Sequence, residues 1–533
     1  MYDVIIVGSG GAGLTAALSA KQEGKEVLVI TKTLVTHSQT CQAQGGINAV
    51  LYENEDSIEQ HINDTYKASL NLASKQNIKY LCEHAKDAII WLNKIGVPFS
   101  RDENNQISQR KFGGTKMLRT CYSSDYTGLK ILQTLYDKCL NEKVEFLEEH
   151  ILLDLIMDEY KISCAGVTIL DIKSSELKDI HAKSIILATG GYAGIYSNKT
   201  TNSTSNTADG LAIAYKNKVE LSNMEFVQFH PTTLKHTNIL ISESARGEGG
   251  FLLDCNKERF IDELTTRDKV SRAIYKKQSD NNDVYLDLRH LGSQKIKEIM
   301  PQERDLAKEF SNILIEEEIL PIEPASHYSM GGIKVDINGQ TNIKNLYALG
   351  ECAQANIHGA NRLGGNSLLE LIVMGKTVGA YAAKNHIKCE YQIKSNIEDL
   401  NVQINTLLTN DNCLNFYEDK NRLADMLFSK VGLFRSKDSL YQALDQVRKL
   451  RDNIDNIGIN DKSKVYNKNL IDYIEYKNTL DIAKVTILSA IHRKESRGSH
   501  FRVDYENTDE ELNLITTIKL NDGIDCVYYE DIK

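Results

Sequence analysis

The first thirty residues constrain the fold of this 533-residue chain more than any other stretch. An apolar strand, Tyr2-Asp3-Val4-Ile5-Ile6-Val7, leads into the turn Gly8-Ser9-Gly10-Gly11-Ala12-Gly13, then into an apolar helix and a second strand, Val27-Leu28-Val29-Ile30. Glycines permit the tight turn, and they let a pyrophosphate approach the N-terminus of the helix. The order therefore predicts a βαβ unit that binds a dinucleotide, with an ordinary strand-to-helix turn as the alternative.

The residues after the second strand indicate which dinucleotide to expect. Nicotinamide cofactors usually have their ribose held by an acidic residue near that position. Here Ile30 is followed by Thr31-Lys32-Thr33, which contains no acid. The sequence therefore favours FAD.

Composition excludes several classes of function. A formal net charge of −10 argues against a nucleic-acid surface and against a polybasic membrane patch. No apolar run could span a bilayer, and a strand that starts at residue 2 leaves no room for a signal peptide, so we expect a cytoplasmic protein. The ten cysteines form no C-x-x-C pair, which predicts reduced thiols and no metal or iron–sulfur centre held by this chain alone.

The pattern of strands and helices divides the chain. It lapses after Pro231 for on the order of a hundred residues, enough for an inserted domain, and resumes at Asn345–Glu351. We expect an α/β fold in which a Rossmann-like FAD-binding domain is built from two segments and carries an inserted α+β capping domain, followed by a helical domain. The predicted ranges are 1–235 and 341–388 for the FAD-binding domain, 236–340 for the capping domain, 389–505 for the helical domain and 506–533 for a C-terminal tail.

Four stretches crowd polar residues between glycines, at 228–233, 242–250, 326–332 and 358–370. Together with nearby Arg267 they offer His230, His327, His358, Arg246 and Arg362. Arginine forks bind carboxylates in bidentate fashion, and histidines and hydroxyls add hydrogen bonds, so the set suits a small dianion. Taken singly, each histidine is more typical of a structural role. The Thr/Asn/Ser run at 200–207 is the one low-complexity segment.

At these residues the sequence resembles the flavoprotein subunits of fumarate reductase and succinate dehydrogenase, a family that includes L-aspartate oxidase. The resemblance runs almost the full length. It is carried by GSGGAGL at 8–14, FGGTKMLRTCYSSDYTG at 112–128, ATGG at 188–191, MEFVQFHPT at 224–232, ESARGEGG at 243–250, TRDKVSRA at 266–273, VYLDLRHLG at 284–292, HYSMGG at 327–332, GE at 350–351, HGANRLGGNSLLE at 358–370 and RKESRGSHFRVDY at 493–505.

The resemblance implies a flavoprotein oxidoreductase that reduces fumarate to succinate, or the reverse, by hydride transfer at FAD N5. His230, Ser242, His327 and Arg362 would bind the dicarboxylate, Arg267 would donate the proton, and Glu243 and Arg246 would relay protons to it. FAD would be contacted by Gly8, Gly10, Gly11, Ala12, Gly13, Thr31, Lys32, Ser38, Gln39, Thr40, Gln44, Gly45, Gly46, Asp209, Glu351, Ser367 and Leu368.

One residue departs from the pattern of members with covalent FAD. They carry a histidine six residues before their glycine pair, where this chain has Gln39 ahead of Gly45-Gly46. An amide cannot form the histidyl–flavin bond, so we expect non-covalent FAD, with His37 as the only nearby alternative. In the family the covalent link raises the flavin potential, so its loss favours fumarate reduction.

Two other activities are weighed against fumarate reduction. L-aspartate oxidase is disfavoured because Arg362 is followed by Leu363-Gly364-Gly365 rather than a Met-Ala-Ser type of sequence, and because Phe112 precedes Gly113-Gly114 where the oxidase has a glutamate for the substrate ammonium. The second alternative is a flavin module that only transfers electrons. The resemblance also implies an iron–sulfur subunit and a membrane anchor as partners, with the chain peripheral on the cytoplasmic face of the inner membrane.

Overall fold

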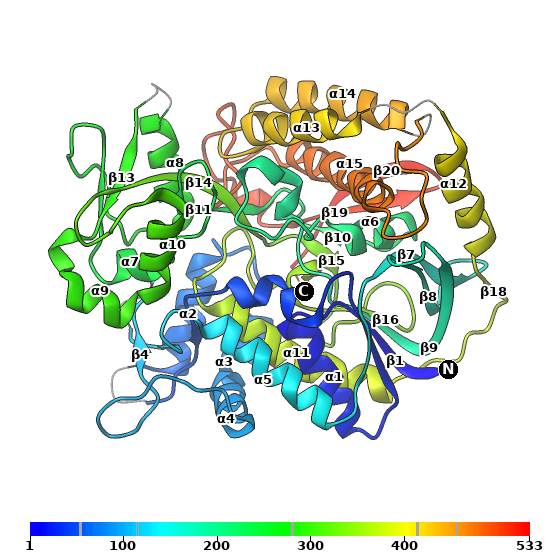
Figure 1. The fold of residues 1–533 in the computed structure, drawn as a ribbon, viewed down its shortest axis with the longest axis horizontal. Coiled ribbons are helices and arrows are strands. Elements are labelled where there is room, and N and C mark those ends of the chain that lie inside the picture. The colour runs from blue at the N-terminus through cyan, green and yellow to red at the C-terminus, as the bar shows by residue number, and fades with distance from the viewer. Residues whose placement is uncertain are drawn as a thin grey trace.

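The computed structural model describes residues 1–52, 56–112, 115, 117–278, 282–411, 415–454 and 457–532. In Figure 1 the capping region, in green, lies at the left of the molecule, and a layer of yellow and orange helices lies at the top. The N-terminal strand and its sheet lie at the lower right. No helix within the described ranges is both long and apolar enough to cross a membrane.

The main sheet contains the predicted dinucleotide unit. Its strand order is β18-β7-β8-β9-β1-β2-β6, with β16 also pairing with β9. The strands β6, β2, β1, β9 and β16 run parallel, whereas β7, β8 and β9 form an antiparallel meander. Their bounds are β1 Tyr2–Val7, β2 Val27–Ile30, β6 Glu145–Leu147, β7 His150–Asp158, β8 Cys164–Asp171, β9 Leu177–Leu187, β16 Leu346–Ala348 and β18 Ile393–Lys394.

The turn between β1 and α1 (Gly11–Gln22) requires glycine for steric reasons. Gly8 has a φ of +116°, and a Cβ there would lie 2.1 Å from Ala188 O. A Cβ on Gly13 would lie 2.0 Å from Gly8 O, so only glycine lets α1 pack this closely on the turn. Helix α1 then packs between α5 (Thr127–Asn141) and α11 (Asn366–Lys384).

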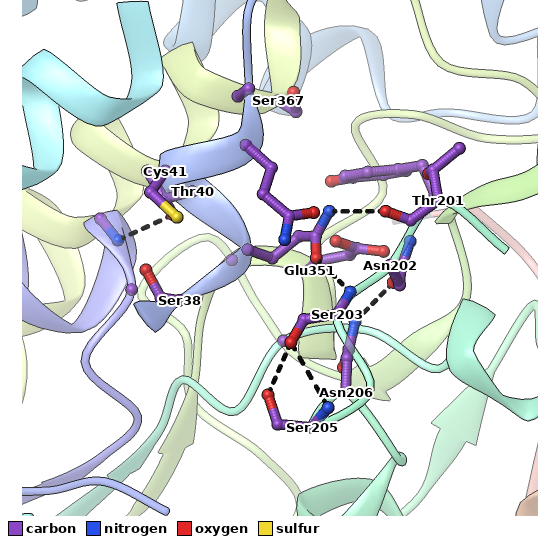
Figure 2. A pocket seen from close by; sticks show the side chains of 18 of the residues that line it. Ser38, Thr40, Cys41, Thr201, Asn202, Ser203, Ser205, Asn206, Glu351 and Ser367 are labelled. Carbon is purple, nitrogen blue, oxygen red and sulfur yellow. Dashed lines mark hydrogen bonds between the residues drawn. The ribbon is translucent and has the colours of Figure 1, made fainter. Parts of the chain in front are cut away.

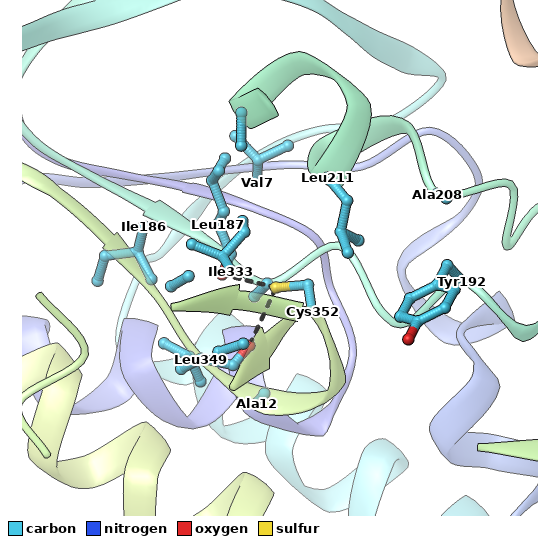
Figure 3. Packing of buried hydrophobic residues seen from close by; sticks show 14 of the residues in the cluster. Val7, Ala12, Ile186, Leu187, Tyr192, Ala208, Leu211, Ile333, Leu349 and Cys352 are labelled. Atoms are coloured by element: carbon cyan, nitrogen blue, oxygen red, sulfur yellow. Dashed lines mark hydrogen bonds between the residues drawn. The ribbon is translucent and has the colours of Figure 1, made fainter. Parts of the chain in front are cut away.

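The apolar core lies where these parallel strands end. Figure 3 shows Val7, Leu187, Leu349 and Cys352 meeting there from separate elements. The thiol of Cys352 donates to Leu187 O at 3.2 Å and to Leu349 O at 3.3 Å. Close packing of these side chains fixes the positions of the carboxyl ends of the strands, which is where ligands bind in such folds.

The capping region has its own sheet and its own hydrophobic core. Its sheet has the order β11-β14-β13-β12, and a separate cluster of buried residues from Leu234 to Ile322 fills it. The elements are β11 Val227–Leu234, α7 Glu243–Gly247, β12 Phe251–Leu253, α8 Arg267–Gln278, β13 Val284–Asp287, α9 Ser293–Ile299, α10 Pro301–Ser311 and β14 Leu320–Ser329. The boundaries 236–340 remain a prediction, and the pairing of β11 with β14 indicates that the sheet of this region begins at Val227.

Small sheets and helices complete the FAD-binding part. One short sheet joins β3 (Ile47–Asn48), β5 (Thr120–Cys121) and β4 (Gln109–Arg110). The remaining helices here are α2 Ile58–Ala68, α3 Lys75–Glu83, α4 Ala85–Ile95 and α6 Asp209–Lys216. Leu81 of α3 and Ala85, Ala88, Ile89 and Leu92 of α4 are buried, as the spacing of one helical face requires.

The C-terminal third is helical and ends in strands. Helices α13 Phe416–Val431, α14 Lys437–Ile454 and α15 Lys468–His492 form the upper layer in Figure 1, and α12 Ile397–Thr409 runs down its right edge. The segment 506–533, which we expected as a tail, contains the hairpin of β19 (Ile515–Asn521) and β20 (Ile524–Glu530). This hairpin extends a sheet of β17 Ala353–Gln354, β15 Gly332–Lys334 and β10 Leu221–Ser222, so the chain end joins the FAD-binding part.

Two alanine substitutions test which glycine of the turn is required by packing in the folded protein. Gly13→Ala forces a Cβ against Gly8 O and should lower the free energy of unfolding by about 3 kcal/mol, near the upper range for overpacking. Gly10→Ala is the matched control, because its Cβ would lie 3.4 Å from Thr40 Oγ1 in ordinary contact. Its cost should stay below about 1 kcal/mol. Urea unfolding of the cofactor-free variants measures both values, and equal midpoints would contradict the packing argument.

Candidate functional site

A cavity of about 750 Å³ lies at the carboxyl ends of the parallel strands and continues toward the capping region. One part is lined by the glycine turn, the 37–46 segment and the 200–210 loop, and another by residues of the capping region such as Leu306 and Phe310. All the predicted site residues line it except Gly13, Arg246 and His358. His358 lies outside the cavity, with its Nε2 2.9 Å from Glu370 Oε2. Gly13 lies under the turn, and Arg246 lies behind Glu243.

The part of the cavity beside the glycine turn has the properties of a dinucleotide site. Helix α1 starts at the cavity, and its N-cap Gly10 contributes no side-chain hydrogen bond to the helix N-terminus. Several buried polar atoms in the lining, among them Ser38 Oγ, Gln44 Oε1 and Asn206 Oδ1, make no hydrogen bond within the described structure. Buried polar atoms without partners are unfavourable, so this lining fits a ligand rich in hydroxyl, phosphate and amide groups such as FAD.

Lys32 and Asp209 both line the cavity and form a partly buried ion pair there. Lys32 Nζ lies 2.7 Å from Asp209 Oδ2 and 2.8 Å from Glu475 Oε1, and it donates to Thr207 Oγ1 at 2.9 Å. Despite burial, these acids hold the pKa of Lys32 above its usual value. The triad joins the FAD-binding part to α15, and the predicted contacts of Lys32 and Asp209 with FAD remain predictions.

Glu351 is a carboxyl group on the cofactor side whose pKa is raised. It lies after β16, and Oε1 accepts hydrogen bonds from Ser329 N at 2.9 Å and Ser329 Oγ at 3.1 Å. Burial nevertheless raises its pKa to about 7. Figure 2 shows Glu351 and Ser367 in the same pocket as Ser38 and Thr40. A carboxyl group there can accept hydrogen bonds from ribityl hydroxyls.

The Gly45-Gly46 segment forms a flat wall beside an aromatic ring. A Cβ on Gly45 would lie 2.5 Å from the ring of Phe112, so no side chain fits there. Arg110 donates hydrogen bonds to the carbonyl of Gly45 and stacks over Tyr122 at 4.4 Å. These contacts hold the backbone of the wall in place, as expected for a surface that faces a planar ring.

At the other end of the cavity, Gln228 joins two arginines. Its Oε1 accepts from Arg267 Nη1 at 3.0 Å and from Arg362 Nη2 at 3.2 Å. Arg362 also donates to Ser367 Oγ at 3.1 Å and stacks over the ring of Tyr328 at 4.1 Å. Burial, followed by the charge of Arg267, lowers the pKa of Arg362 to about 10, which leaves it protonated at neutral pH. Two cations therefore face one end of the cavity, a suitable arrangement for a dianion.

Glu243 compensates part of this positive charge. It follows Ser242, whose hydroxyl caps α7, and its Oε2 accepts from Arg267 Nε at 2.9 Å and also from Nη2. Arg267 and Arg246 lower the pKa of Glu243 although burial opposes them, so the group is ionised. Arg246 Nη2 lies 3.6 Å from Glu243 Oε1, and Arg246 Nη1 donates to Glu263 O at 2.6 Å. These contacts lead away from the cavity, from Arg267 to Glu243 and then to Arg246, which does not line it.

Two histidines face the same end and are neutral. The rings of His230 and His327 are 5.0 Å apart. Burial and the charge of Arg267 lower both pKa values well below the usual range, with His327 and Arg246 adding to the effect on His230 and Arg362 to that on His327. A neutral imidazole can donate from one nitrogen only, so the position of that proton matters. Among the described residues, no group of three or more His, Cys, Asp and Glu side chains is arranged to hold a metal ion.

Sequence reasoning missed three residues at this end. Gln228 and His230 are two residues apart in β11, so their side chains lie on the same face of the strand. This spacing indicates that Gln228 faces the site together with His230. Tyr328 belongs to the HYSMGG motif and directly follows His327, but sequence reasoning assigned it no role, whereas its ring stacks with Arg362. Thr201, in the segment treated as low complexity, is hydrogen-bonded to His327 at 2.8 Å.

The residues used to weigh L-aspartate oxidase are described only in part. Gly113 and Gly114 lie outside the described residues. Phe112 is buried in the cavity wall, where it offers an aromatic ring and no carboxylate. A Cβ on Gly364 would lie 2.8 Å from Glu243 Oε2, so glycine at this position leaves room for the Arg267–Glu243 pair.

Comparison with known proteins finds similar flavoproteins that cover nearly the whole chain. Residues 3–368 match the family described as FAD binding domain, and residues 420–532 match fumarate reductase flavoprotein C-term. The succinate dehydrogenase flavoprotein subunit of Rickettsia conorii is 38% identical, over 96% of this chain and 91% of its own. The fumarate reductase flavoprotein subunit of Haemophilus influenzae is 33% identical, over 100% of this chain and 94% of its own. An E. coli quinol fumarate reductase structure superimposes with a TM-score of 0.95 at 33% identity, covering 100% of this chain and 97% of that one.

The raised pKa of Glu351 predicts how the stability of the cofactor-free protein depends on pH. Between the ordinary value of 4.5 and about 7, folded Glu351 keeps a proton that the unfolded chain has lost. Its contribution to stability is therefore complete below pH 4.5 and decreases as pH rises, by up to about 3 kcal/mol at pH 7. Chemical unfolding across this range should show a shallower decrease for Glu351→Gln, whereas exposed Glu318→Gln should follow the original protein. Parallel curves for all three proteins would exclude the effect.

Proposed function

Because this chain belongs to the fumarate reductase and succinate dehydrogenase flavoprotein family and binds FAD, we propose that it interconverts fumarate and succinate, with fumarate reduction the favoured direction. The observation that carries the proposal is the pairing of Arg267 and Arg362 through Gln228 at one end of the FAD cavity. A dicarboxylate of four carbons brings two negative charges to these two cations.

Arg362, His230, His327 and Ser242 are proposed to bind the two carboxylates. Arg362 supplies a charged fork that is already oriented by Ser367 and Tyr328. The neutral histidines and the Ser242 hydroxyl supply hydrogen bonds without adding net charge. Fixing both ends of the substrate presents its double bond in one orientation, which lowers the entropic cost of reaction.

The proton is proposed to come from Arg267. When bound, FAD would supply hydride chemistry at its N5 atom for one alkene carbon of fumarate. On the protein side, Arg267 donates a proton to the other alkene carbon, and Glu243 lies within hydrogen-bond distance to return one to it. Arg246, at 3.6 Å from Glu243, is the next group in the relay. Guanidinium is a weak acid, so this role relies on Glu243 to return each proton that Arg267 gives up.

FAD is proposed to bind without a covalent link. Gln39 lines the cavity at the position expected for the tether, and an amide cannot form it. His37 also lines the cavity, two residues away in the chain. The partners proposed for this chain are an iron–sulfur subunit and a membrane anchor, by analogy with relatives that are named subunits. A position on the cytoplasmic face of the inner membrane belongs to the same proposal.

Removing the proposed proton donor provides the first test. Arg267→Ala should lower fumarate turnover, driven by a reduced dye, at least about a hundredfold, because general acid catalysis contributes at least that factor. FAD content should remain unchanged. The exposed Arg289→Ala on the capping region is the matched control and should keep full activity. Undiminished turnover in Arg267→Ala would reject the mechanism.

A second test concerns the flavin and the substrate together. After acid precipitation of the purified holoenzyme, flavin should stay in the supernatant, because Gln39 forms no bond to it. The same preparation should reduce fumarate and make no peroxide from L-aspartate and oxygen. Yellow pellet would point to His37 or another attachment site. Peroxide from aspartate would favour the oxidase, and a flavin without either activity would favour the electron-transfer alternative.

A further inference from the structure

The loop at 200–206 holds the end of β14 that carries His327. Thr201 N donates to Ser326 O at 2.9 Å, and Asn202 Nδ2 donates to His327 O at 2.8 Å. Asn206 Nδ2 in turn donates to Asn202 Oδ1 at 2.5 Å. The backbone on both sides of the histidine is therefore bonded to one loop, and the position of His327 depends on where that loop lies.

The ring of His327 is bonded to the same loop. Thr201 Oγ1 lies 2.8 Å from Nδ1, whereas the other acceptor within its reach, Ser326 O, is 3.4 Å away. The shorter contact favours a hydroxyl that donates to Nδ1. Since His327 is neutral, its single proton then lies on Nε2, which makes no hydrogen bond within the described residues. Nε2 is thereby set as a donor.

Gln39 braces this loop from the opposite side. Its Oε1 accepts from Ser203 N at 2.8 Å, and its Nε2 donates to Thr201 O at 3.4 Å. Figure 2 shows the dashed lines that reach Thr201 and Ser203 inside the pocket. A glutamine provides both an acceptor and a donor, which the loop uses at two points. The 39–42 turn and β14 thus hold the 200–206 loop between them.

We propose that Gln39 and Thr201 are positioning residues that fix the orientation and tautomer of His327 so that Nε2–H donates to a substrate carboxylate. This inference rests on the proposed function, because it takes the ligand to be a dicarboxylate. Without the Thr201 hydroxyl, the neutral ring is free to carry its proton on Nδ1. Nε2 would then be an acceptor facing a carboxylate, which is repulsive.

Variants of the hydroxyl test this inference on the holoenzyme. Thr201→Val should raise KM for fumarate, and the dissociation constant of the non-reacting dicarboxylate malonate, by about tenfold, the value of one hydrogen bond to a charged group. Thr201→Ser keeps the hydroxyl and should restore both constants to within about twofold. Thr200→Val is the matched control for loosening the loop alone, because the Thr200 hydroxyl donates to Ser326 O at 3.2 Å and accepts from Asn202 N at 3.2 Å but does not contact the ring. Its effect on both constants should be well below that of Thr201→Val.

Gln39→Leu provides a second variant that does not touch His327. It should raise the same two constants by a smaller factor, and combined with Thr201→Val it should add little, because both substitutions act on one contact. FAD content and unfolding temperature are measured for every variant. A Thr201→Val protein that binds malonate as well as Thr201→Ser would overturn the inference, as would an equal loss in Thr200→Val. Absence of fumarate turnover in the original protein would instead reject the proposed function.

Discussion

The shared hydrogen bonds of Gln228 are the interaction on which the rest of the site depends. Two buried guanidinium groups repel each other, and the repulsion contributes to the lowered pKa of Arg362. One amide oxygen accepts from both, at 3.0 and 3.2 Å, and keeps them at a fixed separation. The ionised Glu243 offsets one charge and leaves the site cationic. The proposed dianionic substrate would complete the balance, so that its binding and the compensation of charge would be one event.

The fold brings these groups together from separate elements. Gln228 and His230 come from β11, Glu243 from the first turn of α7, Arg267 from the start of α8, and Arg362 from the loop before α11. The capping region thus supplies the proposed acid, and the FAD-binding part supplies the glycine turn and Arg362. Gly364 of the FAD-binding part lies against the Arg267–Glu243 pair of the capping region. The FAD-binding part and the capping region therefore contact each other at the end of the cavity that contains the arginines.

Sequence reasoning predicted the α/β fold, FAD and the family, because each depends on local chemistry. The glycine turn is an example, since a Cβ on Gly13 would collide with the carbonyl of Gly8, only five residues earlier. Long-range contacts were not predictable in this way. The hairpin of β19 and β20 was expected as a tail, because its pairing with β10 joins residues about 300 positions apart, which no local pattern reveals. Thr201 was hidden for the same reason, as its partner His327 lies 126 residues away.

The central claim is that the FAD cavity and the cationic end form one reacting site for a four-carbon dicarboxylate. Rapid mixing of anaerobically reduced holoenzyme with fumarate tests it most directly, with the flavin absorbance followed in a single turnover. The account predicts full reoxidation of the flavin, with one succinate formed per FAD. Flavin that stays reduced in the presence of excess fumarate would contradict it.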